Sequence, residues 1–168
     1  RRADSDLIDN VEGSTQDLIK RGIEFGIPEE IVLEQIADIG QITDAYDRGE
    51  AAFLLANAPG TGKTFVLGGT IREILKKNPQ QRVMYVTMNK DLISQIKEDL
   101  KDYGINSVEF ITYDSLSRGA RPDASDTVLI FDEAHNVKNV KKSKRAIAAQ
   151  VMMRESRMAI LASATPFE

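Results

Sequence analysis

Short apolar runs alternate with longer segments of helical periodicity along most of this chain, and this alternation limits the folds open to it. Five apolar runs are predicted as strands, at 51–56, 82–87, 108–112, 127–131 and 158–162. Three amphipathic segments between them are predicted as helices, at 63–77, 91–103 and 143–153. Strands that are apolar throughout and alternate with helices form parallel sheets covered on both faces. The expected fold class is therefore α/β, with functional groups gathered where the carboxyl ends of the strands meet.

The residue types that are missing exclude several kinds of site. The 168 residues include no cysteine and a single histidine, His135. Disulfides, thiolate zinc sites, a cysteine nucleophile and a multi-histidine metal site within this chain are therefore excluded. No apolar run approaches the length of about 18 residues that a membrane span needs, so no membrane partner is expected. The start, Arg1-Arg2-Ala3-Asp4, has neither an initiating Met nor a signal peptide, which predicts a cytoplasmic segment of a longer protein.

Charge divides the chain into an acidic front and a mildly basic body. Residues 1–50 carry 5 Lys and Arg against 13 Asp and Glu, whereas residues 51–168 carry 17 against 13. In the front, residues 5–25 have loosely helical apolar spacing, and Pro28-Glu29-Glu30 is a favourable helix start. We expect an acidic helical segment over 1–50 and the sheet domain over 51–168. The basic excess suits an anionic partner such as nucleic acid, although an ordinary solvated surface is the simpler explanation.

A glycine-rich loop, residues 57–64, links the first predicted strand to the following helix. It reads Asn57-Ala58-Pro59-Gly60-Thr61-Gly62-Lys63-Thr64, with Asn57 where Gly or Ala is usual. Glycines let successive backbone N–H groups point at phosphate oxygens, and the helix N-terminus favours the same negative charge. In such a loop Lys63 reaches the β- and γ-phosphates and the Thr64 hydroxyl coordinates Mg²⁺. We therefore predict that ATP and Mg²⁺ are bound by Pro59, Gly60, Thr61, Gly62, Lys63 and Thr64.

Two adjacent carboxylates follow the fourth predicted strand, in the sequence Phe131-Asp132-Glu133-Ala134-His135. Asp132 is predicted to hold the magnesium ion, through water, and Glu133 to act as the general base that polarises the attacking water. An acid pair at the end of a strand is by itself an ordinary solvated feature. Together with the phosphate loop it indicates hydrolysis of Mg²⁺·ATP, with Lys63, Asp132 and Glu133 as the catalytic residues.

Hydroxyl residues end the fifth predicted strand, in the sequence Ser163-Ala164-Thr165-Pro166. Neighbouring parallel strands end side by side, about 4.8 Å apart. If the fourth and fifth strands are neighbours, His135 lies within reach of Ser163 or Thr165. We expect a hydrogen bond there that reports the state of the γ-phosphate, and a plain turn of small residues is the alternative.

Three of these motifs together resemble motifs I, II and III of superfamily 2 helicases and translocases. They are Gly-Thr-Gly-Lys-Thr at 60–64, Asp-Glu-Ala-His at 132–135 and Ser-Ala-Thr at 163–165, in that order. The resemblance covers residues 35–168. It implies the first of the two RecA-like domains of such a motor, a P-loop NTPase fold, and DNA-dependent ATPase activity. It also implies a second RecA-like domain, with the arginine fingers of the family, in the same parent chain.

Two further segments resemble family elements that touch the nucleic-acid backbone. Thr87-Met88-Asn89-Lys90 occupies the place of motif Ia, and Thr112-Tyr113-Asp114-Ser115-Leu116 resembles the element near motif Ib. Hydroxyl, amide and ammonium groups at helix starts are good phosphate ligands that read no base. The resemblance implies backbone contacts from Asn89, Lys90, Thr112, Tyr113 and Ser115. Plain helix capping is the alternative explanation.

A glutamine upstream of the loop is implied to read adenine, as the Q motif does in this family. Gln41 lies 21 residues before Gly62 and is assigned this role, with Gln35 and Gln16 as alternatives. A solvent-exposed glutamine without function is a further alternative.

Within the superfamily, residues 132–139 are similar to Swi/Snf-type DNA translocases. The strand 53–57 and the ending 162–165 are closer to strawberry-notch-like proteins and to the helicase parts of phage or plasmid antirestriction proteins, which implies a bacterial, phage or plasmid origin. The basic residues between 138 and 145 could rest on a DNA backbone or simply begin a solvated helix.

Two other functions stay open. A ring-forming AAA-type ATPase has a similar phosphate loop, although the Ser-Ala-Thr element at 163–165 argues against that class. A catalytically idle binding module could keep the same fold, although the intact Lys63, Asp132 and Glu133 argue against it.

Overall fold

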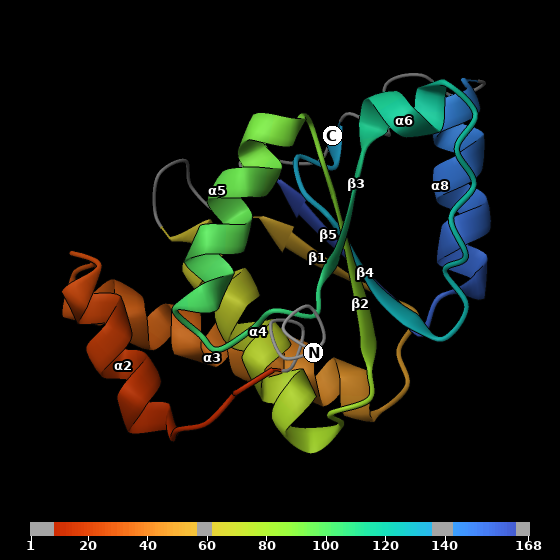
Figure 1. Cartoon of the computed structure of the whole chain (residues 1–168). Coiled ribbons are helices and arrows are strands. Elements are labelled where there is room, and N and C mark those ends of the chain that lie inside the picture. Colours follow the sequence, from red (N-terminus) through yellow and green to blue (C-terminus); the bar gives the residue numbers. More distant parts are fainter. Residues whose placement is uncertain (1–8, 57–61, 136–142, 164–168) are drawn as a thin grey trace, which may run out of the picture.

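The computed structural model describes residues 9–56, 62–135 and 143–163 of the chain. Within these residues, five parallel strands form one sheet in the order β1-β5-β4-β2-β3 (Figure 1). The strands are β1 (Ala52–Ala56), β2 (Arg82–Thr87), β3 (Glu109–Thr112), β4 (Thr127–Phe131) and β5 (Met158–Ser163). Each predicted strand is found, with bounds that differ by at most one residue, so the α/β fold with a parallel sheet is confirmed.

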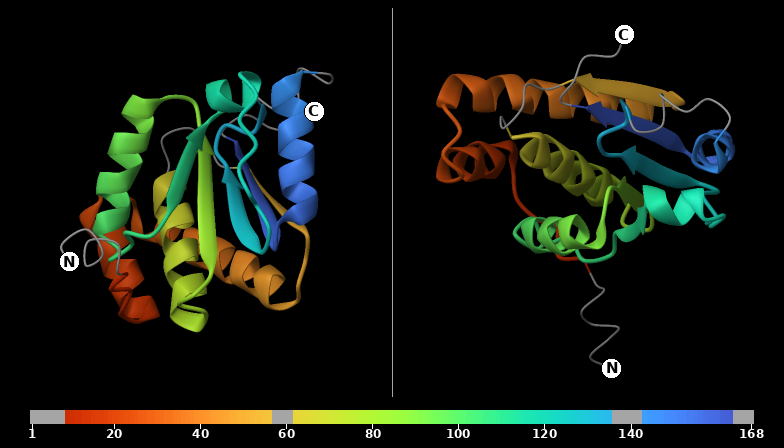
Figure 2. Two further views of the ribbon diagram at one scale, coloured as in Figure 1. Left: turned by 45° about the vertical axis from the view of Figure 1, so that its right-hand side comes forward. Right: turned by 90° about the horizontal axis from the view of Figure 1, so that it is seen from above.

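Helices cover both faces of this sheet (Figure 2). One face carries α3 (Glu29–Asp47), α4 (Lys63–Lys77) and α5 (Lys90–Lys101), with α2 (Thr15–Glu24) packed on α3. The other face carries α6 (Tyr113–Ser117) and α8 (Lys144–Glu155). The sequence did not predict α6 as a separate helix, because its 5 residues are too few to show a periodic pattern. None of the described helices has the length and apolar character needed to cross a membrane.

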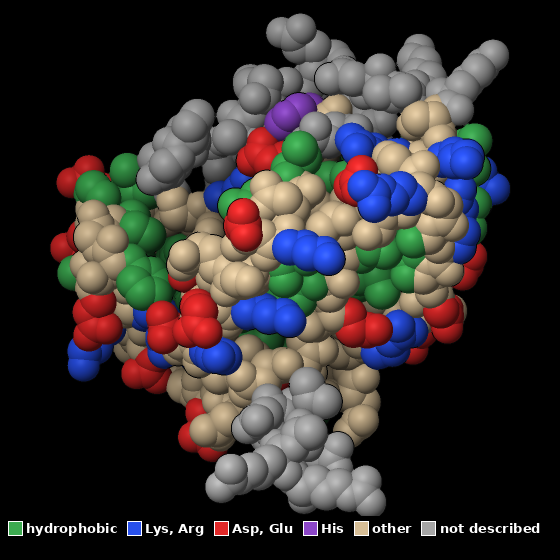
Figure 3. All heavy atoms as spheres, turned by 45° about the horizontal axis from the view of Figure 1, so that its top comes forward, with side chains coloured by type: hydrophobic (Ala, Val, Ile, Leu, Met, Phe, Trp, Pro, Cys, Tyr) green, Lys and Arg blue, Asp and Glu red, His purple; other side chains and the backbone are tan. Residues whose placement is uncertain are grey.

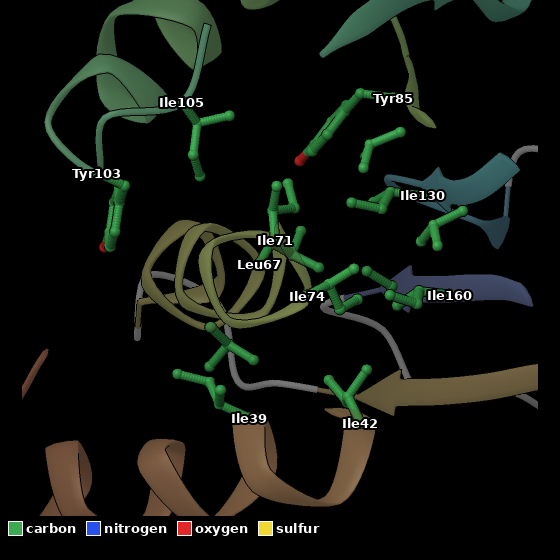
Figure 4. Close-up of a cluster of buried hydrophobic side chains, with 14 of the residues drawn as sticks. Ile39, Ile42, Leu67, Ile71, Ile74, Tyr85, Tyr103, Ile105, Ile130 and Ile160 are labelled. Atoms are coloured by element: carbon green, nitrogen blue, oxygen red, sulfur yellow. The ribbon is translucent and has the colours of Figure 1, made fainter. Parts of the chain in front are cut away.

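Side chains on the two faces of the sheet form two hydrophobic clusters. Successive strand residues point to opposite faces. Tyr85 and Ile130 therefore join the larger cluster, in which Ile71 of α4 is fully buried (Figure 4). Their sequence neighbours Val86 and Phe131 join the second cluster, with side chains from α6 and α8. The strands are thus held from both sides, which fixes the relative positions of the residues at their carboxyl ends.

Local sequence explains where the helices begin. Ser14 and Asp17 form a reciprocal capping box at the start of α2. The side chains of Asn89 and Ser143 each accept a hydrogen bond from a backbone N–H group in the first turn of α5 and α8. α3 starts immediately after Pro28, whose restricted φ suits a helix start.

The acidic front shares its core with the sheet. Leu18 of α2 and Val32, Ile39 and Ile42 of α3 are buried in the same cluster as the strands. The division of the chain at residue 50 therefore stays a prediction about sequence composition, while α2 and α3 pack as part of the sheet domain.

Candidate active site

The described part of the phosphate loop lies directly before α4. Gly62 has a φ of +77°, in the left-handed region that glycine adopts without strain. A Cβ at this position would lie 2.9 Å from Ile27 Cδ1 and 3.0 Å from both polar atoms of the Gln35 amide. The backbone therefore approaches its neighbours more closely than a larger residue would allow. Pro59, Gly60 and Thr61, which the sequence predicts to bind phosphate, lie outside the described residues.

Lys63, the first residue of α4, reaches across to the end of β4. Its Nζ lies 2.6 Å from Asp132 Oδ1 and 2.5 Å from Glu133 Oε1. Burial acts to lower the pKa of Lys63, but its hydrogen bonds to the two carboxylates and their negative charges raise it above the usual value. Lys63 is therefore charged at neutral pH. The three residues predicted to be catalytic lie in direct contact.

Asp132 is nearly buried and is held at both carboxylate oxygens. Its Oδ2 accepts a hydrogen bond of 2.9 Å from the hydroxyl of Tyr85, and its Oδ1 accepts one of 2.9 Å from the backbone N–H of Glu133. Burial raises the pKa of Tyr85 well above its usual value, and the charge of Asp132 raises it further. The Tyr85 hydroxyl thus remains a donor, and the carboxylate of Asp132 has a fixed orientation.

The turn after β4 is joined to the neighbouring strand. Glu133 has a φ of +51°, which few residues other than glycine adopt. The backbone N–H of Ala134 donates to the carbonyl of Ala162 on β5, at 2.9 Å. This bond and the pairing of Phe131 with Leu161 confirm that the fourth and fifth strands are neighbours. The turn that carries the predicted base is therefore anchored to a second strand.

His135 lies at the same edge and faces β5. Its Nδ1 is 3.2 Å from the Oγ of Ser163 and 3.6 Å from Glu133 Oε2. The expected contact between His135 and Ser163 is therefore present, whereas Thr165 lies outside the described residues. The coupling role assigned to these residues stays a prediction.

The residues predicted to hold magnesium are Thr64, partly exposed in the first turn of α4, and Asp132. Within the described ranges, no group of three or more His, Cys, Asp or Glu side chains could hold a metal ion. Magnesium in nucleotide sites is usually bound by one or two protein oxygens, with phosphate oxygens and water completing the shell. Thr64 and Asp132 therefore fit an ion that binds together with a nucleotide.

The glutamine beside the phosphate loop is Gln35 rather than Gln41. Gln35 is only 5% exposed, and its amide adjoins Gly62 as described above. Gln41 is exposed on α3, and Gln16 is exposed on α2. The count of residues back from Gly62 favoured Gln41, but such a count ignores which face of α3 points toward the loop.

The residues predicted to contact nucleic acid differ in their access to solvent. Asn89 and Lys90 are exposed at the start of α5. Thr112 caps α6, where its Oγ1 accepts a hydrogen bond of 3.1 Å from the N–H of Ser115. Tyr113 is completely buried and its hydroxyl donates to the backbone carbonyl of Asp132, at 2.7 Å. The expected contact from Tyr113 is therefore wrong for this structure, because the packing of α6 turns the ring inward.

Basic side chains gather over α6 and α8 on the face that carries the predicted catalytic residues, beside the histidine (Figure 3). The described basic residues directly after α6 and at the start of α8 are Arg118, Arg121, Lys144 and Arg145. Arg145 is partly buried and donates from Nε to the Ser117 hydroxyl, at 2.9 Å. The basic residues at 138, 141 and 142 lie outside the described residues.

A hollow of about 320 Å³ opens beside the start of α4. Its lining combines aromatic and aliphatic groups with one carboxylate, from Phe25, Ile27, Gly62, Thr64, Phe65, Asp99 and Tyr103. Phe25 is 49% exposed although it is aromatic. The hollow therefore offers a flat apolar ligand a place next to the predicted phosphate site.

Sequence reasoning missed Tyr85, whose hydroxyl binds the predicted metal ligand. A signal was present, since Tyr85 carries a hydroxyl in the middle of the strand, between the apolar residues Met84 and Val86. Buried tyrosine hydroxyls usually have a partner. The sequence did not reveal that the partner is Asp132 on the adjacent strand.

Comparison with known sequences finds a family match over a region that includes the glycine-rich loop. The family model described as "Type III restriction enzyme, res subunit" matches residues 29–123. UvrABC system protein B of Enterococcus faecalis is 32% identical over 106 residues, which are 61% of this chain and 15% of that protein. UvrABC system protein B of Lactiplantibacillus plantarum is 29% identical over 133 residues, or 77% and 18% of the two chains. This chain thus spans less than a fifth of the length of these relatives.

Two solved structures share the fold. The Sulfolobus solfataricus SWI2/SNF2 ATPase core in complex with dsDNA aligns with a TM-score of 0.68 and 20% identity, over 79% of this chain and 31% of that one. The UvsW helicase from bacteriophage T4 aligns with a TM-score of 0.55 and 14% identity, over 73% and 50%. These two matches confirm the fold. The family match supports the resemblance to a superfamily 2 helicase domain, while the narrower resemblance to strawberry-notch-like proteins stays a prediction.

Proposed function

Because this chain belongs to the family of the type III restriction enzyme res subunit, we propose that it is the ATP-binding motor domain of a DNA-dependent helicase or translocase. The observation that carries the proposal is the contact of Lys63 with Asp132 and Glu133, directly after the glycine-rich loop. A cation and two carboxylates at the carboxyl edge of a parallel sheet are the groups that hydrolysis of Mg²⁺·ATP requires.

The phosphates of ATP are placed at the N-terminus of α4, where the loop and the helix dipole favour negative charge. Lys63 exchanges its carboxylate partners for the β- and γ-phosphates. Thr64 and Asp132 would hold a magnesium ion, whose charge would stabilise the negative phosphate oxygens. Glu133, released from Lys63, orients and polarises the attacking water.

The adenine base is placed in the hollow beside Gly62 and Thr64. Phe25 and Ile27 offer the base an apolar surface there, and the buried amide of Gln35 adjoins Gly62 at the edge of this hollow. An amide presents a donor and an acceptor side by side, which matches the adenine edge. We assign adenine recognition to Gln35 in preference to Gln41.

Nucleic acid is the proposed partner, bound through its phosphate backbone. Asn89 and Lys90 at the start of α5 and Ser115 on α6 offer groups that bind phosphate and read no base. The basic side chains over α6 and α8 extend that surface with the charge that phosphate attracts. The parent chain is proposed to contain a second RecA-like domain, which supplies arginine fingers. The proposed location of the protein is the cytoplasm.

The two alternative functions are less well supported. An AAA-type ATPase is expected to have a polar sensor and no histidine at the end of the acidic motif, whereas His135 here contacts Ser163. An idle binding module does not require a lysine paired with two carboxylates beside a glycine-rich loop.

Steady-state ATP hydrolysis by the full-length protein tests the proposal. We expect Mg²⁺-dependent hydrolysis that double-stranded DNA stimulates several-fold, and little stimulation by RNA. Hydrolysis that no nucleic acid stimulates would favour the AAA-type alternative. Absence of both ATP binding and hydrolysis would favour an idle module and overturn the proposal.

A further inference from the structure

Two buried tyrosine hydroxyls hold Asp132, and they bind it at different groups. Tyr85 donates to the carboxylate, at 2.9 Å, whereas Tyr113 donates to the backbone carbonyl, at 2.7 Å. Tyr85 comes from β2, in the cluster on the α4 side of the sheet, and Tyr113 from α6, in the cluster on the other side. The first hydroxyl therefore orients the predicted magnesium ligand, and the second orients only the main chain.

The carbonyl that Tyr113 binds belongs to the peptide that joins Asp132 to Glu133. Glu133 has a φ of +51°, so the direction of its side chain depends on a peptide orientation that the residue does not favour by itself. The other side of this turn is fixed by the bond from Ala134 to Ala162 on β5. The hydroxyl of Tyr113 thus stabilises the peptide whose orientation aims the proposed general base.

Tyr113 also belongs to α6, which carries proposed phosphate-binding groups. Thr112 immediately before it and Ser115 two residues after it form the cap of that helix. The guanidinium of Arg145 from α8 lies 5.4 Å from the centre of the Tyr113 ring, and its Nε bonds Ser117 of α6. A movement of α6 or of Arg145 on contact with a phosphate backbone would therefore reach the Asp132–Glu133 peptide through one rigid side chain.

We propose that Tyr113 is a positioning residue that links the nucleic-acid face of α6 to the aim of Glu133. The proposal rests on the proposed function, since it takes Glu133 as the base and α6 as part of the nucleic-acid surface. It assigns Tyr113 a role in the hydrolytic step and none in binding ATP or magnesium. Burial raises the pKa of the Tyr113 hydroxyl, in keeping with a permanent donor.

The test is Tyr113→Phe in the full-length protein, which keeps the ring and its packing and removes only the hydroxyl. We expect the DNA-stimulated kcat to fall about tenfold, the effect of losing one hydrogen bond in the transition state. The KM for ATP and the magnesium concentration for half-maximal rate stay within twofold of wild type. Tyr85→Phe is the contrast, because it frees an oxygen of Asp132 and shifts the magnesium dependence.

Tyr46→Phe is the matched structural control. The hydroxyl of Tyr46 is also buried and donates to Gln81 Oε1 at 2.6 Å, but it lies at the opposite end of the sheet. This variant is expected to lose stability comparable to that lost by Tyr113→Phe, with kcat unchanged.

A double mutant tests whether Tyr113 acts through Glu133. In a Glu133→Asp background the base is already displaced, so Tyr113→Phe is expected to lower kcat less than threefold, because the two changes act on the same step.

The outcomes separate the two proposals. If the wild-type protein hydrolyses ATP on DNA and Tyr113→Phe retains its kcat, or loses kcat only in proportion to its Tm, the role of Tyr113 is overturned while the proposed function stands. Equal losses from Tyr113→Phe in the wild-type and Glu133→Asp backgrounds also overturn it. If the wild-type protein shows no DNA-stimulated hydrolysis, the proposed function itself fails.

Discussion

Buried polar groups lie at both ends of the sheet. At the amino end they bond to neutral groups of the fold, whereas at the carboxyl end opposite charges pair with one another. At the amino end, Gln81 accepts from the Tyr46 hydroxyl at 2.6 Å and donates to the backbone carbonyls of Arg82 and Asp126, at 2.9 and 2.8 Å. Arg157 donates to the Tyr46 carbonyl at 2.6 Å and lies 4.4 Å from the centre of its ring. The three groups bonded to Gln81 are neutral and belong to the fold itself, so no ligand is needed to satisfy them.

At the carboxyl end, opposite charges satisfy one another. Lys63 is paired with Asp132 and Glu133, and its side chain is 22% exposed. Such a cluster can exchange partners, since an anion can compete for the lysine while a cation takes a carboxylate. Burial of polar groups therefore does not by itself mark a site. The candidate site differs because its charges are partly buried, are paired with one another and can still be reached by a ligand.

Removing the proposed base is expected to affect hydrolysis more than any other change at the carboxyl end. Glu133→Gln keeps the shape of the side chain, and we expect ATP binding to persist while single-turnover hydrolysis slows about 1,000-fold. Glu109→Gln, which removes a carboxylate paired with Arg82 at the amino end, is the control and should leave the rate unchanged. A near wild-type rate for Glu133→Gln would show that another group activates the water.

Removing the cation should weaken binding without unfolding the protein. Lys63→Ala is expected to lower the affinity for Mg²⁺·ATP about 100-fold, measured by calorimetric titration, because two charge-assisted hydrogen bonds to phosphate are lost. Lys77→Ala, at the other end of α4, removes a surface ion pair with Asp47 and should have no effect on affinity. Unchanged affinity in Lys63→Ala would mean that ATP binds elsewhere.

A smaller effect is expected at the link between strands. His135→Ala in the full-length protein should leave ATP affinity nearly unchanged. It should lower the stimulation of hydrolysis by DNA about threefold, because the hydrogen bond between His135 and Ser163 is lost. His135→Asn, which can keep a bond to Ser163, should retain more of the stimulation. The measurement compares basal and stimulated rates with the Tm. Full stimulation in a destabilised His135→Ala protein would show that His135 contributes to stability and not to the coupling.

The amino end should respond in the opposite way. Gln81→Ala leaves the Tyr46 hydroxyl and two backbone carbonyls without this partner, and we expect the free energy of unfolding to fall by about 2 kcal/mol. Denaturant unfolding measures this loss, and the kcat for ATP should stay within twofold of wild type. A large loss of kcat at unchanged stability would show that the two ends of the sheet are functionally connected.

Most of the secondary structure could be predicted from the sequence, because its signals are local. The α4 helix has the predicted bounds because Gly62 precedes it and Asn78 and Pro79 end it. The helix expected over 91–103 begins one residue earlier, at Lys90, after the capping side chain of Asn89. The segment 5–25 was less well predicted, since only Thr15–Glu24 of its described part is helical, after the capping box at Ser14.

The candidate site was predicted in part. The motifs identified Lys63, Asp132, Glu133 and the pairing of His135 with Ser163, because parallel strands end at one edge and neighbouring strands bring their last residues together. The contact expected from Tyr113 and the assignment of adenine recognition to Gln41, which is exposed on α3, share a cause. Both depended on the direction in which a helix points its side chains, and that direction is set by packing.

Local sequence specifies the five strands, the longer helices and the residues at the carboxyl edge, because periodicity and capping act between residues close in the chain. Tertiary packing sets three further features: Gln35 adjoins Gly62, Tyr113 is turned inward, and two tyrosine hydroxyls hold Asp132. Tyr85 and Tyr113 lie 47 and 19 residues from Asp132 along the chain. Contacts over such separations depend on the strand order and on which side of the sheet each helix covers, and no local pattern encodes either.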